Sequence, residues 1–391
     1  MRYTVACNWD PQLIDRIDYP EVDAVFAGLP NTTIASGRSS LLIKDMDEQG
    51  VKDYIQRVHA KGWSFDYNVN STCLANSELR ADGRKQIMEY LQEVCGLGVD
   101  SLTISLPLLV EIVKKHFPRL KVKVSTYQKI HSVSMAQRYE DLGADAIVLS
   151  EFVNRDLALL EAIRRAVKCQ LVLIANVGCI YDCPNVFAHA NSIAHSGAKG
   201  ERTTIFTETY QTYCTMKRLE SPAELIKMRW IRPEDVSYYE DVGIDMLKII
   251  DRHSSTEALA ERVKAYHERQ FKGNLLDLAG QMTNQKKSDL INLRQVLDDG
   301  GREEADKLME FLAALSIPIR DLFYVDNQRF PQDFLEGFRQ RNCATISCER
   351  CGYCRRVADA TVTVTDQGRI DAARRKLQDV RSRIVEGSIL Y

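Results

Sequence analysis

The feature that most constrains the fold of this sequence is a strand–helix alternation that repeats eight times. Short β-branched runs recur along the first 250 residues or so, and each is followed by a stretch of helical character. Strands that alternate with helices are typical of parallel βαβ units, and eight such units match a TIM barrel. The eight runs are 3–7, 22–29, 64–70, 101–106, 121–126, 146–150, 170–176 and 246–250.

The segments between these runs carry the apolar period of amphipathic helices. In residues 155–168, Leu157, Leu160, Ile163 and Val167 recur at roughly helical spacing. The first crossover, between residues 8 and 21, is short for a full helix.

After the eighth run the pattern changes. Residues 256–271 and roughly 286–315 are predicted to be helical, and a charged helical tail covers 368–387. We therefore predict an α/β fold, a (β/α)8 TIM-barrel-like domain at residues 1–272. A mostly helical, cysteine-containing C-terminal extension is predicted at residues 273–391.

Composition limits the environment and the partners of the chain. Its 391 residues are 45 % hydrophobic, which suits a sizeable core, and the net charge of -2 gives no general attraction to nucleic acid or to an anionic membrane. No apolar run approaches the roughly 20 residues of a transmembrane helix, and the first residues lack a signal-peptide apolar region. We expect a cytoplasmic protein whose eleven cysteines are reduced, so clustered cysteines indicate metal or redox chemistry.

A TIM barrel presents its functional groups at the C-terminal ends of its strands. Glu151 follows the sixth run and is a candidate acid or base, and Arg252 follows the eighth and is suited to clamp a carboxylate or phosphate. Lys248 lies within the eighth run, and His131 follows the fifth. The alternative is that polar residues at strand ends simply meet solvent.

The strongest local signal for a metal site follows the seventh run. Cys179 and Cys183 are four residues apart, Pro184 breaks the backbone after them, and Cys214 lies about 30 residues further on. At the end of a barrel such thiols are candidate metal ligands; the alternative is that they are small buried hydrophobes. His189 and His195, in the same segment, are six residues apart and would not share a helix face, so structural hydrogen bonds are the simpler interpretation.

A second cysteine group lies in the extension. Cys343, Cys348, Cys351 and Cys354 follow the spacing Cys-x4-Cys-x2-Cys-x2-Cys. Thiols at x2 intervals suit an iron–sulfur cluster, whereas a structural zinc usually takes two close pairs separated by a longer loop. Iron–sulfur is therefore preferred here, with zinc as the alternative for these four cysteines. Cys73, Cys95 and Cys169 stand singly and are interpreted as structural. Cys7 ends the first run, so it is either a residue that faces the site or a buried thiol.

Several segments together resemble the collagenase-like peptidase family, the thirty-second family of peptidases of unknown type. They are "KVKVSTYQKIHSV", "LGADAIVLSEF", the cysteine-bearing segment after "LVLIAN", and "WIRPEDVSYYEDVGIDMLKIIDR". The C-terminal "YVDNQRF", "FLEGF" and "CERCGYC" resemble the extension of a subgroup. The chain departs from the commoner family pattern in having only three residues between Cys179 and Cys183.

The resemblance implies a TIM-barrel-like catalytic domain and, as in several members, a [4Fe-4S] cluster held by four cysteines. It implies oxygen-independent hydroxylation of ubiquinone precursors or RNA bases, beside the older peptidase name. Seven cysteines of this chain are then candidate ligands, and we predict one or two clusters. In the favoured arrangement the extension holds a four-thiolate cluster and Cys179, Cys183 and Cys214 hold another; in the alternative, one cluster takes thiols from both segments.

The leading hypothesis is an iron–sulfur-dependent redox enzyme that carries out a hydroxylation-type modification of a small molecule, an RNA base or a peptide. Glu151 and His131 then transfer protons, and Lys248 and Arg252 anchor the substrate. The alternatives are a metal-stabilised peptidase and a non-catalytic subunit of a heteromeric iron–sulfur complex. Against the peptidase, the sequence has neither a His-Glu-x-x-His motif nor a Gly-x-Ser-x-Gly motif.

The partners follow from the leading hypothesis. A redox enzyme needs an electron source, so an electron-donor protein is expected, and the family resemblance leaves a homodimer or heterodimer open. No membrane partner is expected. Nucleic-acid binding through the basic segments 119–123 and 373–383 is the weaker alternative, because such runs more often form solvated faces.

Overall fold

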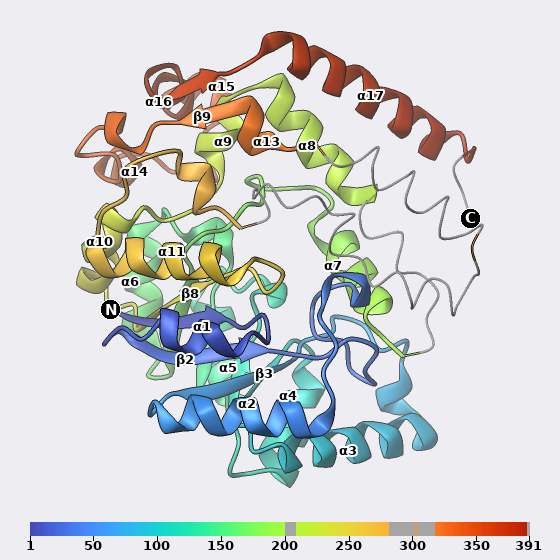
Figure 1. The fold of residues 1–391 in the computed structure, drawn as a ribbon. Coiled ribbons are helices and arrows are strands. Elements are labelled where there is room, and N and C mark those ends of the chain that lie inside the picture. The colour runs from blue at the N-terminus through green and yellow to red at the C-terminus, as the bar shows by residue number, and fades with distance from the viewer. Residues whose placement is uncertain (200–208, 281–301, 303–316, 389–391) are drawn as a thin grey trace.

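Eight parallel strands close into a barrel in chain order, and β8 pairs back onto β1 (Figure 1). The computed structural model describes residues 1–199, 209–280, 302 and 317–388. Each predicted run coincides with one strand, so the TIM-barrel prediction is confirmed. The strands are β1 (Arg2–Ala6), β2 (Val22–Ala27), β3 (Ser64–Val69), β4 (Ser101–Ile104), β5 (Lys121–Val124), β6 (Ala146–Val148), β7 (Gln170–Ile174) and β8 (Met246–Ile249).

Strand register decides which side chains fill the barrel. On β1, the Tyr3 hydroxyl donates to the backbone carbonyl of Tyr266 at 2.8 Å, outside the barrel. Side chains alternate along a strand, so Thr4 faces the interior. Thr4 pairs with Ala24 of β2 and with Lys248 of β8, and the closing register therefore brings Lys248 into the interior.

One side of the barrel interior is polar and fully buried. Asp66 of β3 accepts hydrogen bonds from Thr103 Oγ1 at 2.7 Å, Ser101 Oγ at 3.1 Å and Lys123 Nζ at 3.0 Å. A buried ion pair is tolerated when the geometry is good and the remaining lone pairs are satisfied. The two hydroxyl donors meet that condition for Asp66.

Helices surround the barrel, and side-chain caps define where several of them begin. Asp156 accepts from the Leu159 amide at 3.0 Å, and Ser255 accepts from the Ala258 amide at 3.2 Å; each such cap stabilises its helix by about 1 kcal/mol. The short first crossover does contain a helix, of six residues. The outer helices are α1 (Pro11–Arg16), α2 (Glu48–Ala60), α3 (Ala81–Gly96), α4 (Pro107–His116), α5 (Val133–Asp141), α6 (Leu157–Ala166), α10 (Val236–Asp241) and α11 (Thr256–Glu268).

The connection between β7 and α10 is much longer than the others and lies at the C-terminal end of the barrel, hereafter the mouth. The part of it that the structure describes contains the α-helices α7 (Val186–Ser196), α8 (Gln211–Glu220) and α9 (Ala223–Lys227). Arg218 of α8 donates to the backbone carbonyl of Gly178, which ties α8 to the loop after β7. This insertion carries the cysteines that the sequence places near the seventh strand.

The extension packs along α6, α8 and α9, and its last helix arches over this side of the molecule (Figure 1). The predicted helices at 256–271 and 368–387 are confirmed as α11 and α17, whereas the one at 286–315 lies, apart from residue 302, outside the described residues. A domain boundary at residue 272 stays a prediction. The extension comprises α13 (Ile319–Leu322), β9 (Phe323–Val325), α14 (Glu336–Arg339), α15 (Cys348–Cys351), α16 (Tyr353–Thr361), β10 (Val362–Val364) and α17 (Gln367–Val385).

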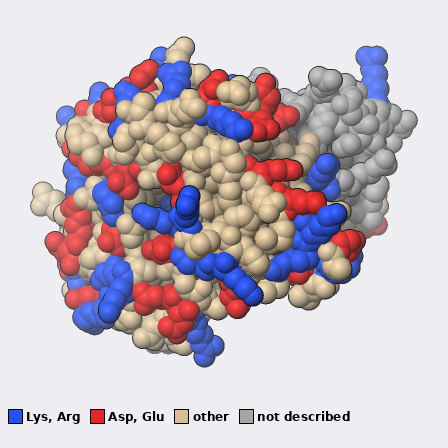
Figure 2. All heavy atoms as spheres, turned by 90° about the horizontal axis from the view of Figure 1, so that it is seen from below, with Lys and Arg blue, Asp and Glu red and all other residues tan. Residues whose placement is uncertain are grey.

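The surface view fits the nearly balanced charge of the chain. On the face drawn in Figure 2, basic and acidic side chains intermix around an uncharged centre, without a broad field of one sign. A search of the described helices for one that combines the length and the apolar character of a membrane span gave none.

Candidate functional site

A buried ion pair between Glu151 and Lys129 lies at the mouth. Glu151 follows β6, and Lys129 ends the turn η3 (Thr126–Gln128) in the left-handed conformation, with φ 49°. Lys129 Nζ lies 2.5 and 2.8 Å from the two carboxylate oxygens, and Thr126 Oγ1 donates at 3.1 Å. Burial alone would lower the pKa of Lys129, but the charge of Glu151 raises it above its usual range, so the pair is ionic.

His131 is not the partner of Glu151. Its side chain is exposed, and Nδ1 lies 2.7 Å from the backbone carbonyl oxygen of Lys129. The cation that meets Glu151 is thus Lys129, which the sequence analysis missed although it also follows the fifth strand. Only the left-handed backbone at Lys129, a tertiary detail, distinguishes the two positions.

The mouth cysteines, Cys179, Cys183 and Cys214, come close enough to influence one another. Burial, with smaller contributions from the charges of Glu151 and Cys214, raises the pKa of Cys179 to about 12, while Lys129 opposes the shift. Burial also raises the pKa of Cys183, and Cys214 again adds to the effect. The three thiols are therefore in electrostatic range of one another, and Cys179 is also in range of the Glu151–Lys129 pair.

The extension cysteines, Cys343, Cys348, Cys351 and Cys354, are arranged around two short helices. Cys348 and Cys351 are the first and last residues of α15, and Cys354 lies in the first turn of α16. Burial raises the pKa of Cys354, Arg155 and Arg229 lower it, and Cys343 and Cys348 raise it. At least three of the four thiols are thus neighbours in space.

Neither cysteine set is drawn together as tightly as bound ligands would be. Within residues 1–199, 209–280, 302 and 317–388, no three His, Cys, Asp or Glu side chains converge closely enough to hold one ion. The thiol chemistry suits a soft metal, but a centre would require these side chains to move inward.

Lys248 projects into the barrel interior, over the ring of Phe26 at 3.7 Å from its centroid. Burial lowers the pKa of Lys248 to about 7; the nearby charge of Asp66 opposes this, and those of Lys123 and Arg252 add to it. No hydrogen bond or ion pair of its amine is found among the described residues. The residue is 7 % exposed, so the interior holds an amine poised between its two protonation states near neutral pH.

Arg252 lies at the mouth beside a second cluster that the sequence analysis missed. Its guanidinium donates to the carbonyl of Ser36 at 2.5 Å and to Ser36 Oγ at 3.2 Å. Nearby, Asp251 accepts from Arg38 at 3.1 and 3.2 Å, and His253 Nε2 lies 3.0 Å from its other oxygen. Arg252 itself meets no carboxylate in the described structure, which leaves it suited to an anionic ligand.

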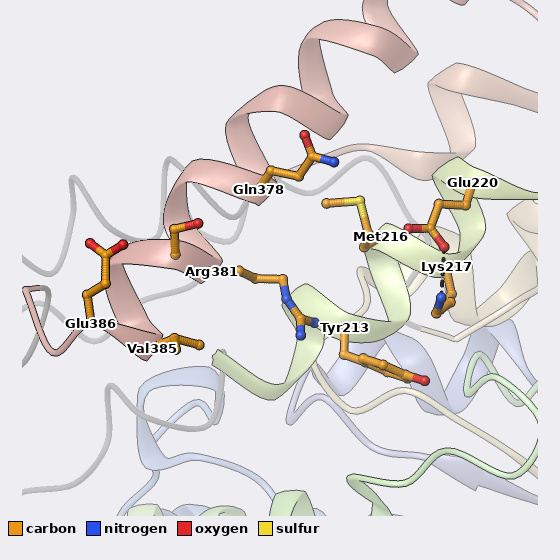
Figure 3. A pocket seen from close by; sticks show the side chains of 9 residues that line it. Tyr213, Met216, Lys217, Glu220, Gln378, Arg381, Val385 and Glu386 are labelled. Atoms are coloured by element: carbon orange, nitrogen blue, oxygen red, sulfur yellow. Dashed lines mark hydrogen bonds and ion pairs between the residues drawn. The ribbon is translucent and has the colours of Figure 1, made fainter.

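Away from the mouth, a hollow separates α8 from α17 (Figure 3). Arg381 of α17 points toward Tyr213 of α8, with the guanidinium carbon 5.5 Å from the ring centroid, and Lys217 pairs with Glu220 at 2.9 Å. None of the predicted site residues lines this hollow. Its lining consists of Tyr213, Met216, Lys217, Glu220, Gln378, Arg381, Ser382, Val385 and Glu386.

Comparison with known proteins gives a consistent picture. The model of Peptidase family U32 matches residues 17–294, a range that contains the mouth cysteines but ends before the extension cysteines. "Uncharacterized protease MJ1657" of Methanocaldococcus jannaschii is 24% identical over 343 residues, which are 87% of this chain and 89% of that protein. "tRNA hydroxylation protein P" of Escherichia coli is 28% identical over 149 residues, 37% of this chain and 29% of that protein.

Among solved structures, the chain matches the U32 peptidase Mk0906. It superimposes with a TM-score of 0.48 at 21% identity, and the match covers 64% of this chain and 93% of that one.

Proposed function

This chain belongs to peptidase family U32, and from that premise we propose that it is an iron–sulfur-dependent redox enzyme whose substrate meets the mouth of the barrel. The proposed reaction is an oxygen-independent, hydroxylation-type modification, in which a substrate C–H bond becomes C–OH, the oxygen comes from water or an oxygen-donating co-substrate, and an external acceptor or that co-substrate takes the two electrons released. One observation carries the proposal: three thiols lie in electrostatic range of one another, and Cys179 is in range of a buried Glu151–Lys129 pair, at the end of the barrel where TIM-barrel enzymes do their chemistry.

The donor set suits the proposed cofactor. Thiolates are the preferred ligands of iron–sulfur clusters, and a cation near each set offsets their negative charge: Lys129 at the mouth and Arg155 at the extension. Cys179, Cys183 and Cys214 would hold a mouth centre, and the four extension cysteines a second. When bound, such a centre supplies electron transfer or substrate activation.

The protein groups at the mouth have separable roles in this proposal. Glu151, which Lys129 and Thr126 contact, accepts or returns a proton at its carboxyl oxygen. Arg252 binds an anionic group of the substrate, since its guanidinium is otherwise bonded only to Ser36 in the described structure. Lys248 anchors the part of the substrate that reaches into the barrel.

Of the three substrate classes, an RNA base has specific support. One matching protein carries the name tRNA hydroxylation protein P, although the match covers 37% of this chain. The nearly balanced charge argues against strong backbone-driven RNA binding, so recognition would fall to local contacts at the mouth.

The test begins with anaerobic purification of the full chain. We expect visible absorbance that bleaches with dithionite, together with iron and acid-labile sulfide. Cys179→Ser should lose the mouth iron, whereas the matched control Cys95→Ser, a thiol on α3 away from both sets, should keep all of it. A colourless, iron-free wild-type protein would refute the proposal.

The substrate is tested in cells grown without oxygen. Mass spectrometry of tRNA nucleosides should show one extra oxygen in a strain that expresses the wild-type chain and none in a strain that expresses Cys179→Ser. Identical nucleosides in the two strains would exclude a tRNA base as the substrate, and would leave the iron–sulfur part of the proposal standing.

A peptidase is the second candidate, because a relative that matches 87% of this chain is named a protease. It predicts peptide cleavage that survives the loss of iron and sulfide. Cleavage by metal-free protein, retained in Cys179→Ser, would favour this candidate over the redox enzyme.

A further inference from the structure

Two guanidinium groups are buried beneath the extension without a carboxylate partner. Arg155 precedes α6 and is 3 % exposed. It donates to the carbonyl oxygens of Ile226 at 2.5 Å and Trp230 at 3.4 Å, and its Nε has no partner. No ion pair to a carboxylate is present in the described part of the chain.

Aromatic rings enclose the Arg155 guanidinium. Its central carbon lies 4.5 Å from the ring of Trp230, 5.0 Å from Phe334 and 5.1 Å from Phe338. Trp230 belongs to the barrel segment and the two phenylalanines to the extension, so Arg155 lies at the junction of the two. Ring faces attract a cation, but they do not cancel its charge.

Arg229 repeats this situation beside Arg155. It is 4 % exposed, its Nε also lacks a partner, and its guanidinium lies 3.8 Å from the ring centroid of Tyr181. Burial lowers the pKa of Arg155 to about 10, and the charge of Arg229 lowers it further. The two cations therefore repel each other in a region from which water is largely excluded.

Arg232, close to Arg229 in the sequence, differs from these two arginines because it has a carboxylate partner. Arg232 packs on Phe330 and Phe334 but also forms a double contact with Asp235, at 2.6 and 2.8 Å. A buried charge without such a partner costs several kcal/mol. Arg232 has a carboxylate in direct contact, whereas Arg155 and Arg229 form no ion pair with an acidic side chain in the described structure. Asp235 acts on Arg155 only through its charge, without direct contact.

The extension cysteines lie beside the ring cluster that encloses Arg155. Tyr353, the neighbour of Cys354 in α16, packs on Phe338 with the ring centroids 5.2 Å apart and donates its hydroxyl to the carbonyl of Phe334 at 2.8 Å. The positive charges of Arg155 and Arg229 also act on Cys354. Four thiolates around a divalent metal, or around a [4Fe-4S] core of charge two plus, leave a net charge of two minus. Arg155 and Arg229, with one positive charge each, would balance that net charge.

We propose that Arg155 and Arg229 are the fixed counter-charges of a metal centre held by Cys343, Cys348, Cys351 and Cys354. The inference rests on the proposed function, because it takes the extension thiols as ligands. The arginines do not touch the metal: they are positioning residues that lower the cost of gathering four thiolates. They come from the barrel segment, so the centre is completed only when the extension docks.

The first test measures metal affinity with Co²⁺ as the probe. The full chain carrying Cys179→Ser is stripped of metal without oxygen and titrated, and the thiolate-to-Co²⁺ absorbance is followed. Adding Cys354→Ser identifies the signal of the extension. We expect Arg155→Gln and Arg229→Gln each to weaken this binding at least about tenfold, and Arg155→Lys and Arg229→Lys to keep most of it.

The second test measures the potential of the centre. After iron–sulfur reconstitution of the same chains, reduction adds one negative charge to the centre. Loss of a nearby positive charge should therefore lower the midpoint potential. A tenfold change in the one-electron equilibrium corresponds to 59 mV, and the Gln variants should shift by at least about that amount while the Lys variants do not.

The outcomes separate the two proposals. If the Cys179→Ser chain gives no Co²⁺ signal that depends on Cys354, the extension centre itself is refuted. If the signal is present but the Gln variants match the parent in affinity and potential, the centre stands and the counter-charge role is wrong. Equal losses in the Lys and Gln variants would assign the effect to packing and would also overturn it. Should Arg155→Gln fail to fold, Arg229→Gln decides, because it leaves the Trp230–Phe334 stack in place.

Discussion

In the barrel, Lys123 and Lys129 each meet a carboxylate, whereas Arg155 and Arg229 beneath the extension meet aromatic rings. All four residues are buried. These two lysines are neutralised by acids that the chain supplies on a neighbouring strand and loop. Arg155 and Arg229 form no ion pair with an acid within the described ranges, and the proposed metal centre of the extension would account for this difference.

The two regions also differ in how they relate to the family. The mouth cysteines lie within the range matched by the family model, and the extension cysteines lie beyond its end. The mouth is thus the part in which this chain resembles its family, and the extension adds a second set of thiols to it. Whether the two sets act as two centres is open to direct measurement.

The largest expected effect is on iron content. With two clusters, Cys354→Ser should lower iron from about eight to about four atoms per chain, and Cys179→Ser should do the same, because each removes one ligand set. Iron and sulfide analysis of anaerobically purified protein measures this. Complete loss of iron in both variants would instead indicate one centre shared by the two regions.

The next largest effect is expected at the barrel cation Lys123, which is paired with the carboxylate of Asp66. Asp66→Ala removes the acceptor of Lys123, Ser101 and Thr103 and leaves a buried unpaired ammonium. The free energy of unfolding should fall by about 3–5 kcal/mol in urea denaturation. Ser101→Ala, which removes only one neutral donor, should cost about 1 kcal/mol. Equal losses of unfolding free energy in Asp66→Ala and Ser101→Ala would contradict the expectation that the unpaired charge of Lys123 causes most of the loss.

Lys248 is a buried barrel cation that forms no ion pair in the described structure. The pH dependence of the free energy of unfolding tests its charge state. Burial lowers its pKa from 10.5 to about 7, so between these values the unfolded chain binds a proton that the folded chain does not. The stability of the wild type relative to Lys248→Met should therefore rise with pH across this window, by up to about 1.4 kcal/mol per pH unit. Below pH 7 the difference should stay constant. Urea denaturation of both proteins across the window measures it, and a flat difference would mean that Lys248 stays charged.

The smallest effect is expected where charge is exposed. Lys217 pairs with Glu220 on α8, and the two side chains are 42 and 37 % accessible. Lys217→Ala should change the free energy of unfolding by less than about 0.5 kcal/mol, because solvent screens the pair. A loss of unfolding free energy comparable to that of Asp66→Ala would contradict the expectation that buried ion pairs affect stability more than exposed ones.

Much of the fold followed from local pattern. Each of the eight strands coincides with a predicted run, with β1 beginning one residue before its run, because β-branched residues and turn positions recur at short range. The positions of Glu151, Cys179 and Arg252 at the mouth followed in turn, since strand ends in a TIM barrel share one edge. The contact between Lys129 and Glu151 did not follow from the sequence, because it depends on the left-handed backbone at Lys129.

The sequence by itself determined the barrel and the spacing of its thiols, since both are carried by residues close together in the chain. Only the tertiary structure decided what surrounds those thiols. Arg155, Trp230 and Phe334 are separated by up to 179 positions, yet they form one stack against the extension. Charge compensation acts through space, so whether a buried cation finds an acid or a ring depends on which distant segments fold together.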